Sequence, residues 1–286
     1  MTSRHPEADK GKKCPACLTE KVKRWKNTKL NLYICLNCNL VFQVNAAHQS
    51  YEGEYYDYWD LDNFEDVRRM KVLTSEKYLQ IIYKDTEVNN GNLLDVGCAY
   101  GFTLEAAKKS GFNTYGVEVS PAATIAKERG YEVFRGKVDD APFKTNFFNV
   151  VILIDIIEHV ADPITFMNKL RTLLRDNGIM LIVTPDIFST SRRILGDRWF
   201  HYKDEHICYY SSKSMETLLE KSSYRLLRRY PGFKHLTLKY INAHNLKYHS
   251  TRITKVLSGF TNILPKKITS YPFKMPTDTI YLANKK

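Results

Sequence analysis

The middle of the chain alternates short, almost fully apolar runs with segments whose apolar residues recur at helical spacing. Residues 148–154 and 178–183 are apolar at nearly every position, as strands buried on both faces of a sheet require. Shorter strands are predicted at residues 92–96, 114–119 and 132–135, with helices between them. This alternation predicts an α/β fold with a doubly wound, mostly parallel sheet and helices on both faces.

The flanking segments extend this pattern less regularly. Apolar residues near one face predict a helix over residues 64–83, which follows an aromatic and acidic stretch at 51–59. This stretch is either a linker packed on the core or a lid over a ligand. Beyond residue 186 we expect a helix at 214–221 and strands at 225–229 and 279–283.

Four of the six cysteines have the spacing of a metal site. Two C-x2-C pairs are separated by 17 residues and consist of Cys14, Cys17, Cys35 and Cys38. The spacing is typical of a four-thiolate zinc site, in which four protein ligands leave no position open for catalysis. The alternative is free or disulfide-bonded cysteines, which a chain without a secretory signal disfavours. A small zinc ribbon with a structural zinc ion is therefore expected over residues 1–48.

A glycine-bearing turn follows the first predicted strand of the sheet. Asp95, Gly97 and Gly101 stand at the carboxyl end of that strand, where ligands bind in doubly wound folds. Glu118 ends the next strand, where its carboxylate could bind both hydroxyls of a ribose. The dinucleotide pattern G-x-G-x-x-G is absent, because Ala99 stands at its second glycine position. Asp95 would repel a phosphate and attract a cation, which favours S-adenosylmethionine (SAM), a ligand with a sulfonium and an amino group.

The chain resembles the class I SAM-dependent methyltransferases in four segments, which are residues 93–101, 115–123, 147–163 and 178–185. The resemblance implies a Rossmann-like sheet of seven strands. It also implies a cofactor site whose residues come from successive strand ends. The residues carried over are Asp95, Gly97, Ala99 and Gly101 around the methionine part, Glu118 and Val119 at the ribose, Asp139 or Asp140 beside the adenine, and Asp155 near the substrate.

Both ends of the chain resemble a bacterial subgroup of methyltransferases associated with sugar and surface-polysaccharide biosynthesis. The zinc-ribbon motif, the 51–59 segment and the stretch 206–224 carry this resemblance. Two departures from the family pattern affect the site. Ala99 replaces a middle glycine, and Lys137 stands where many relatives have an adenine-binding aspartate.

Two histidines are candidate catalytic bases. His159 follows the strand at 148–154, and His206 stands among charged and aromatic residues beyond the strand at 178–183. Imidazole has a pKa near neutrality, so either side chain could accept the proton of a hydroxyl or amine. The alternatives are that His159 is a helix-start or packing histidine that only shapes the pocket, and that His206 is a surface or hydrogen-bonding histidine of a loop.

The formal net charge of +12 over 286 residues is unevenly distributed. The segment 51–186 is acidic, and both ends are basic, so we expect an anionic small-molecule acceptor such as a nucleotide-linked sugar. The basic stretch 251–267 has the pattern of an amphipathic helix and allows peripheral membrane contact. No apolar run is long enough for a transmembrane helix, and no signal peptide is visible, so we expect a cytoplasmic protein.

The sequence therefore predicts a methyltransferase of a small glycan-pathway substrate. Its expected parts are the ribbon at 1–48, an aromatic lid and leading helix at 49–90, a SAM-binding core at 91–186, and substrate-binding insertions at 187–286. RNA methylation by way of the ribbon and the basic C-terminal region is the first alternative, although no RNA-binding signature is present. A non-catalytic binding protein with this fold is the second.

Overall fold

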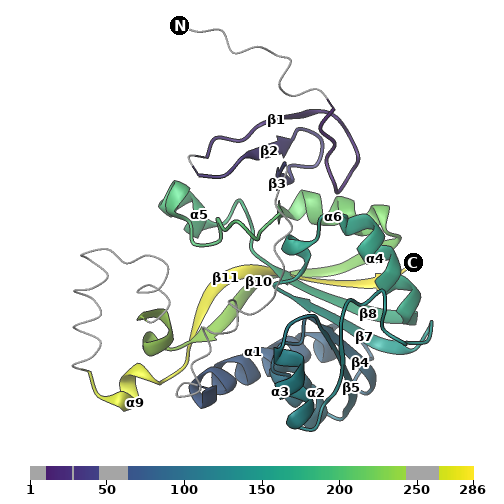
Figure 1. Ribbon diagram of the computed structural model, residues 1–286, viewed down its shortest axis with the longest axis vertical. Coiled ribbons are helices and arrows are strands. Elements are labelled where there is room, and N and C mark those ends of the chain that lie inside the picture. The colour runs from purple at the N-terminus through teal and green to yellow at the C-terminus, as the bar shows by residue number, and fades with distance from the viewer. Residues whose placement is uncertain (1–10, 28, 45–63, 243–263) are drawn as a thin grey trace, which may run out of the picture.

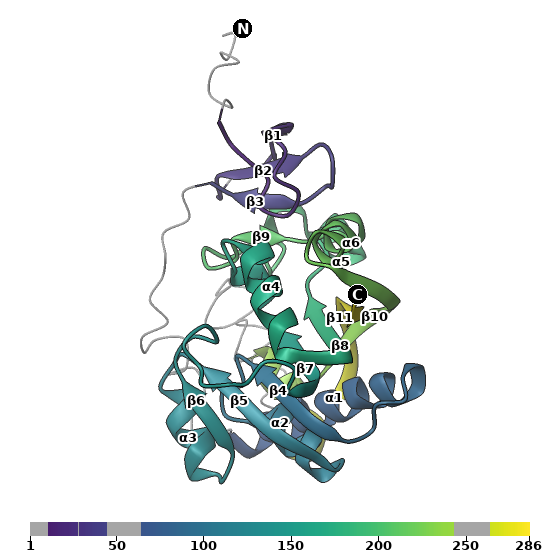
Figure 2. The same ribbon diagram turned by 90° about the vertical axis from the view of Figure 1, so that its right-hand side faces the viewer.

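The computed structural model describes residues 11–27, 29–44, 64–242 and 264–286. A large mixed sheet forms the centre of the fold, with the strand order β10-β11-β8-β7-β4-β5-β6 (Figures 1 and 2). The five strands from β8 to β6 are parallel, as the alternating pattern predicts. They are β4 (Gly91–Val96), β5 (Phe112–Glu118), β6 (Glu132–Arg135), β7 (Phe148–Ile154) and β8 (Leu174–Thr184).

The last two strands make this mostly parallel sheet a mixed one. Strand β11 (Phe273–Lys285) pairs antiparallel with β8, and β10 (Tyr224–Leu236) pairs antiparallel with β11. Both are 13 residues long, well beyond the predicted segments 225–229 and 279–283. Prediction underestimated them because charged residues interrupt the apolar pattern in β10, whose outer edge pairs with no other strand of this sheet.

Helices cover both faces of the sheet, which confirms the α/β character. Successive residues of a strand point to opposite faces, so Leu93 of β4 packs with α1, α2 and α3, while Leu94 packs with α4 and α6. The helices are α1 (Phe64–Asp85), α2 (Phe102–Lys109), α3 (Ala122–Glu128), α4 (Pro163–Leu173) and α6 (Ser212–Lys221). Residues 190–195 form the short helix α5 (Thr190–Leu195), followed by the 3-10 turn η4 (Gly196–Arg198), and α9 (Lys266–Thr269) precedes β11.

The cysteine-bearing N-terminal segment forms a second, smaller sheet at the top of the molecule in Figure 1. Its strands are β1 (Val22–Arg24), β2 (Leu32–Cys35) and β3 (Val41–Gln43). A fourth strand, β9 (Cys208–Tyr209), joins its edge by pairing with β3. The ribbon is therefore joined by main-chain hydrogen bonds to the segment that carries His206, which its sequence position did not indicate.

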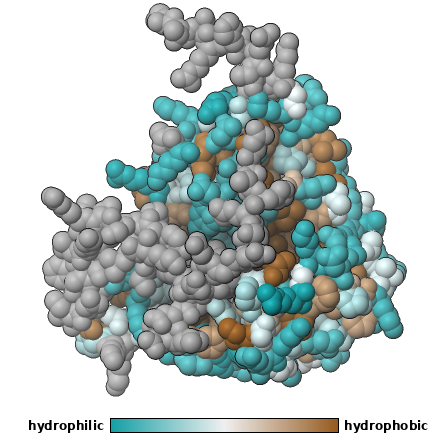
Figure 3. Space-filling model, in the orientation of Figure 1, coloured by the Kyte–Doolittle hydropathy of each residue, from teal (hydrophilic) through white to brown (hydrophobic). Residues whose placement is uncertain are grey.

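Two predicted features lie wholly or mostly outside the described residues. They are the aromatic segment 51–59, all of which lies outside, and the amphipathic stretch 251–267, most of which does. Among the described residues, no helix has both the length and the apolar character to cross a membrane. The face in Figure 3 is largely hydrophilic, with hydrophobic side chains gathered in a few brown patches.

Candidate functional site

The turn between β4 and α2 has a backbone that requires small residues. Gly97, Ala99 and Gly101 all have positive φ angles, of 78°, 46° and 78°. Gly97 donates its N–H to the carbonyl oxygen of Val117 at 2.7 Å, so the turn crosses the carboxyl end of β5 closely. Glycine adopts this left-handed conformation without steric cost, which explains the spacing of the two glycines.

Glu118 holds this turn against the end of β5. Its carboxylate accepts the main-chain N–H of Ala99 at 2.9 Å and that of Ser120 at 2.8 Å. The side chain is buried. It therefore stands at the strand end where the sequence placed it, and it also shapes the turn that would hold the cofactor.

Asp95 is buried at the base of the same turn. Burial and the nearby carboxylate of Glu118 raise the pKa of Asp95 to about 7, against a hydrogen bond from Thr103 that lowers it. A neighbouring cation would reverse this shift, because an opposite charge favours the ionised carboxyl. The site is thus suited to a ligand with a positively charged group.

Beyond the turn lies a cavity of about 340 Å³. It joins the predicted cofactor residues Asp95, Gly97 and Ala99 to Asp155 and to the two predicted histidines. The remaining walls come from α1, from the segment 200–206, and from β10. One cavity therefore contains both the residues predicted to hold the methionine part of the cofactor and the residues predicted to lie near the methyl acceptor.

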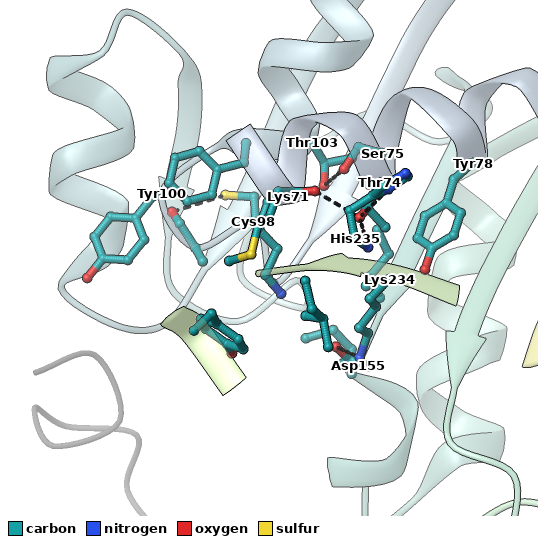
Figure 4. Close-up of a pocket in the computed structure, with 18 of the residues that line it drawn as sticks. Lys71, Thr74, Ser75, Tyr78, Cys98, Tyr100, Thr103, Asp155, Lys234 and His235 are labelled. Carbon is teal, nitrogen blue, oxygen red and sulfur yellow. Dashed lines mark hydrogen bonds and ion pairs between the residues drawn. The ribbon is translucent and has the colours of Figure 1, made fainter. Parts of the chain in front are cut away.

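Asp155 ends β7 in a left-handed conformation, with φ of 55°, which is uncommon for a residue other than glycine. Its two carboxylate oxygens accept hydrogen bonds from Nζ of Lys234 at 2.8 and 2.7 Å (Figure 4). Burial would raise the pKa of Asp155, but Lys234 and Lys71 lower it to about 2. Lys234 also pairs with the buried Asp278 at 3.2 Å.

Lys71 points into the cavity from α1, between Cys98 and Lys234 (Figure 4). Burial and the positive charge of Lys234 lower the pKa of Lys71. Lys203 contributes a third amine to the cavity wall. The acceptor side of the cavity therefore carries several basic groups, of which Lys71 comes from the acidic segment 51–186 and the other two from the basic C-terminal part.

The two predicted histidines meet at the far side of the cavity. Their ring centroids lie 4.7 Å apart in an edge-to-face arrangement. His159 follows Glu158 in the 3-10 turn η3 (Ile157–His159), and His206 stands two residues before β9, the strand that pairs with the ribbon. Burial lowers the pKa of both imidazoles, that of His206 strongly, so both are neutral at pH 7.

Glu158 completes this group. Burial and the charge of Asp155 raise the pKa of Glu158 to about 8. One ligand atom from each of Glu158, His159 and His206 lies within 4.8 Å of the others. The sequence pattern indicated the two histidines but not Glu158, although Glu158 stands three residues after the predicted site residue Asp155.

Other predicted positions lie away from the cavity. Val119 and Asp139 are exposed and are not among the residues that line it. Asp140, the alternative to Asp139, is also exposed. They follow β5 and β6, at the same sheet edge as the turn after β4.

Three charged residues were missed altogether: Lys71, Lys234 and Asp278. They lie on α1, β10 and β11, and the sequence pattern gave none of them a role. No local signal distinguishes them, because their burial results from contacts between elements far apart in the chain.

The four ribbon cysteines come together as predicted. Their sulfur atoms all lie within 4.8 Å of one another, and the Cys14–Cys38 and Cys17–Cys35 sulfurs are each 3.5 Å apart. Sulfurs bound tetrahedrally to zinc at about 2.3 Å would be about 3.8 Å apart, so the donor set fits such an ion. Cys98 and Cys208 are buried elsewhere, and burial raises the pKa of the Cys208 thiol to about 12.

Comparison with known proteins agrees with this geometry. A family model described as "Methyltransferase domain" matches residues 40–228, more than half of the chain. The ubiquinone biosynthesis O-methyltransferase of Cereibacter sphaeroides is 30% identical over 118 residues, which are 37% of this chain and 47% of that protein. The same enzyme from Caulobacter sp. strain K31 is 34% identical over 100 residues, 32% of this chain and 40% of that protein. Each match thus covers less than half of the relative.

Solved structures share the fold. A putative methyltransferase from Bacillus halodurans superposes with a TM-score of 0.52 at 16% identity, over 73% of this chain and 98% of that one. A SAM-dependent methyltransferase from Archaeoglobus fulgidus has a TM-score of 0.51 at 16% identity, over 79% and 99%.

Proposed function

Because this chain belongs to the methyltransferase-domain family and is a class I SAM-dependent methyltransferase, we propose that it methylates a hydroxyl oxygen of a small acceptor. The single observation that carries this proposal is the shared cavity, which runs from the Asp95 turn to the Glu158, His159 and His206 group. The O-methyltransferase relatives support oxygen as the atom that is methylated.

The methionine part of the cofactor would be held by the turn after β4, through Asp95, Gly97, Ala99 and Gly101. The ribose would lie at Glu118 and Val119, and the adenine at Asp139 or Asp140. Bound SAM supplies a methyl carbon activated by the adjoining sulfonium. The acceptor oxygen would form a bond to this carbon as the carbon–sulfur bond breaks with its electron pair going to sulfur, and the hydroxyl proton would pass to a neutral imidazole of His159 or His206. The chain has to align the acceptor at about 3–3.5 Å from the methyl carbon.

The acceptor would lie between Lys71, Asp155 and the two histidines. In their neutral state, His159 and His206 can accept a hydrogen bond from a hydroxyl, which would orient its oxygen. The amines of Lys71, Lys203 and Lys234 support an acceptor with a negative charge. A nucleotide-linked sugar and an acidic phenol of the kind suggested by the ubiquinone-pathway relatives both satisfy this requirement.

A screen of SAM turnover tests this function. Purified protein is incubated with SAM and either nucleotide sugars or hydroxybenzoic acids, and product masses are recorded. Methylation of the oxygen in one class identifies the acceptor. Methylation of RNA alone would replace the small-molecule proposal, and absence of SAM binding in a titration would refute the cofactor assignment.

We also propose that the ribbon holds a structural zinc ion, supported by the distances among the four sulfurs. Metal analysis of reduced protein should then find about one zinc ion per chain. Cys17→Ser should remove it, while Cys98→Ala, which changes a cysteine outside the ribbon, should retain it. Equal zinc content in both variants would contradict the assignment.

A further inference from the structure

Glu158, His159 and His206 form a group of two imidazoles and one carboxylate on the cavity wall. Each offers one ligand atom within 4.8 Å of the other two. Two histidines and one carboxylate are a recurrent ligand set for divalent first-row metal ions, and such sets leave coordination positions open. The group lies outside the cysteine ribbon, so it would be a separate site.

Two polar atoms of this group have no hydrogen-bond partner among the described residues. They are Oε1 of Glu158 and Nδ1 of His206, and each is completely buried. Whole-residue exposure is only 2% for Glu158 and 4% for His206. A buried polar atom without a partner is unfavourable, so its retention calls for a ligand that satisfies it.

The other atoms of the group are held as those of metal ligands usually are. Oε2 of Glu158 accepts a hydrogen bond from the Thr184 hydroxyl at 2.9 Å. Nδ1 of His159 lies 2.9 Å from the carbonyl oxygen of Glu205, so this nitrogen carries the proton and Nε2 has the free lone pair. Such outer hydrogen bonds fix the orientation and tautomer of ligating side chains.

The main chain fixes the spacing between the two halves of the group. Ile207, next to His206, donates its N–H to the carbonyl oxygen of Glu158 at 2.8 Å. Glu158 and His206 are 48 residues apart in the sequence, yet this contact keeps them adjacent. The main chain therefore sets the distance between the two ligands.

Three lysines line the cavity, and two of them lie beside carboxylates. Lys234 pairs with Asp155 and Asp278, and Lys203 lies 3.5 Å from Glu205. Asp155 is engaged by Lys234, so the carboxylate available to an added cation is that of Glu158. A bound cation would hold the Glu158 carboxyl in its ionised form, because an opposite charge favours that form, and the site would then have one anionic and two neutral ligands.

We propose that Glu158, His159 and His206 bind a divalent first-row metal ion whose open coordination positions face the acceptor end of the cavity. The ion binds the acceptor's hydroxyl oxygen and lowers the pKa of that hydroxyl, as metal ions do for bound water. This use of the ion rests on the proposed function, whereas the site itself does not.

The test uses the purified full-length protein with its ribbon metal in place, titrated with Mn²⁺ while the electron paramagnetic resonance signal of free Mn²⁺ is recorded. Mn²⁺ prefers oxygen and nitrogen ligands over thiolates, so it reports on this group rather than on the ribbon. Wild-type protein should bind about one Mn²⁺ per chain, because the three residues form one site.

Four variants test whether Mn²⁺ binds at Glu158, His159 and His206. His206→Leu and Glu158→Gln should weaken Mn²⁺ binding beyond detection. Thr184→Val keeps all three ligands and should weaken it about tenfold through Glu158 alone. His235→Gln changes a cavity histidine outside the group and should bind as wild type does. Far-ultraviolet circular dichroism checks that each variant is folded.

Failure of the site and failure of the proposed function are distinguishable, because SAM binding is titrated in the same samples. Wild-type protein that binds SAM but not Mn²⁺ would overturn the metal site and leave the methyltransferase proposal intact. Equal Mn²⁺ affinity in wild type and folded His206→Leu would also overturn it. Mn²⁺ binding without SAM binding would uphold the site and refute the cofactor assignment.

Discussion

The side-chain Nε2 of Gln43, on the ribbon, donates to the main-chain carbonyl oxygen of His206 at 2.8 Å. The same nitrogen also lies within hydrogen-bond distance of the carbonyl oxygens of Lys203 and Asp204. One ribbon side chain therefore holds the loop that carries a cavity histidine. The ribbon acts as part of the cavity's support, in addition to being a cysteine cluster.

Gln43→Leu should loosen this loop without removing the ribbon metal. The leucine cannot donate to the three carbonyl oxygens, and loss of such hydrogen bonds costs about 1–2 kcal/mol in the free energy of unfolding. Hydrogen–deuterium exchange should become faster over residues 203–207, with zinc content unchanged. Unaltered exchange in this loop would show that strand pairing with β9 is sufficient to hold it.

Lys234→Met should destabilise the fold because it leaves Asp155 and the buried Asp278 without their shared cation. Breaking such a pair costs about 3 kcal/mol or more, which urea unfolding can measure. Lys239→Met is the matched control, since Lys239 forms an exposed ion pair with Asp66 at 3.1 Å. Its loss should be below about 1 kcal/mol. Similar losses in both variants would mean that the Asp155–Lys234–Asp278 network contributes no more than a surface pair.

SAM affinity should rise with pH through about 7 if Asp95 binds the cofactor's amino group. Burial and Glu118 raise the pKa of Asp95 to about 7 in the unliganded protein, so the carboxyl is neutral below this pH and charged above it. Calorimetric titration between pH 6 and 8, a range of about one unit on each side, should show this increase. Asp95→Asn should bind at least about tenfold more weakly at pH 8 and show a flatter profile. Parallel profiles for the two proteins would exclude Asp95 as the titrating group.

Acid should remove a specific part of the protein's stability through Glu105. Burial alone would raise the pKa of Glu105, but hydrogen bonds from Arg68 and Lys109 outweigh it and lower the pKa from 4.5 to about 2. Because the folded-state pKa is the lower one, this stabilisation is complete above pH 4.5 and is lost as the pH falls toward 2.

Unfolding of Glu105→Gln and wild type should therefore differ most at neutral pH and converge in acid. Glu65→Gln is the control, because Glu65 pairs with the same Arg68 while 77% of its side chain is exposed. It should follow the wild-type pH profile. A constant difference between Glu105→Gln and wild type down to pH 2 would contradict the pKa shift.

The sequence by itself determined the features that depend on local pattern. The apolar runs of β7 and β8 indicated strands buried on both faces, and β6 and β7 have the predicted bounds. The spacing of Cys14, Cys17, Cys35 and Cys38 predicted their cluster, and the Asp95–Gly101 segment predicted a turn at a strand's carboxyl end. These features follow from neighbouring residues alone, because periodicity and turn geometry are properties of short segments.

Only the tertiary structure decided which distant segments meet. It placed β11 between β10 and β8, joined the ribbon to β9, buried Lys234 against Asp155, and brought Glu158 beside His206. The sequence pattern did not predict these contacts, because it records polarity and not the partner that compensates a buried charge. That compensation depends on contacts between distant segments, because Lys234 is 79 positions from Asp155 and 44 positions from Asp278 in the chain.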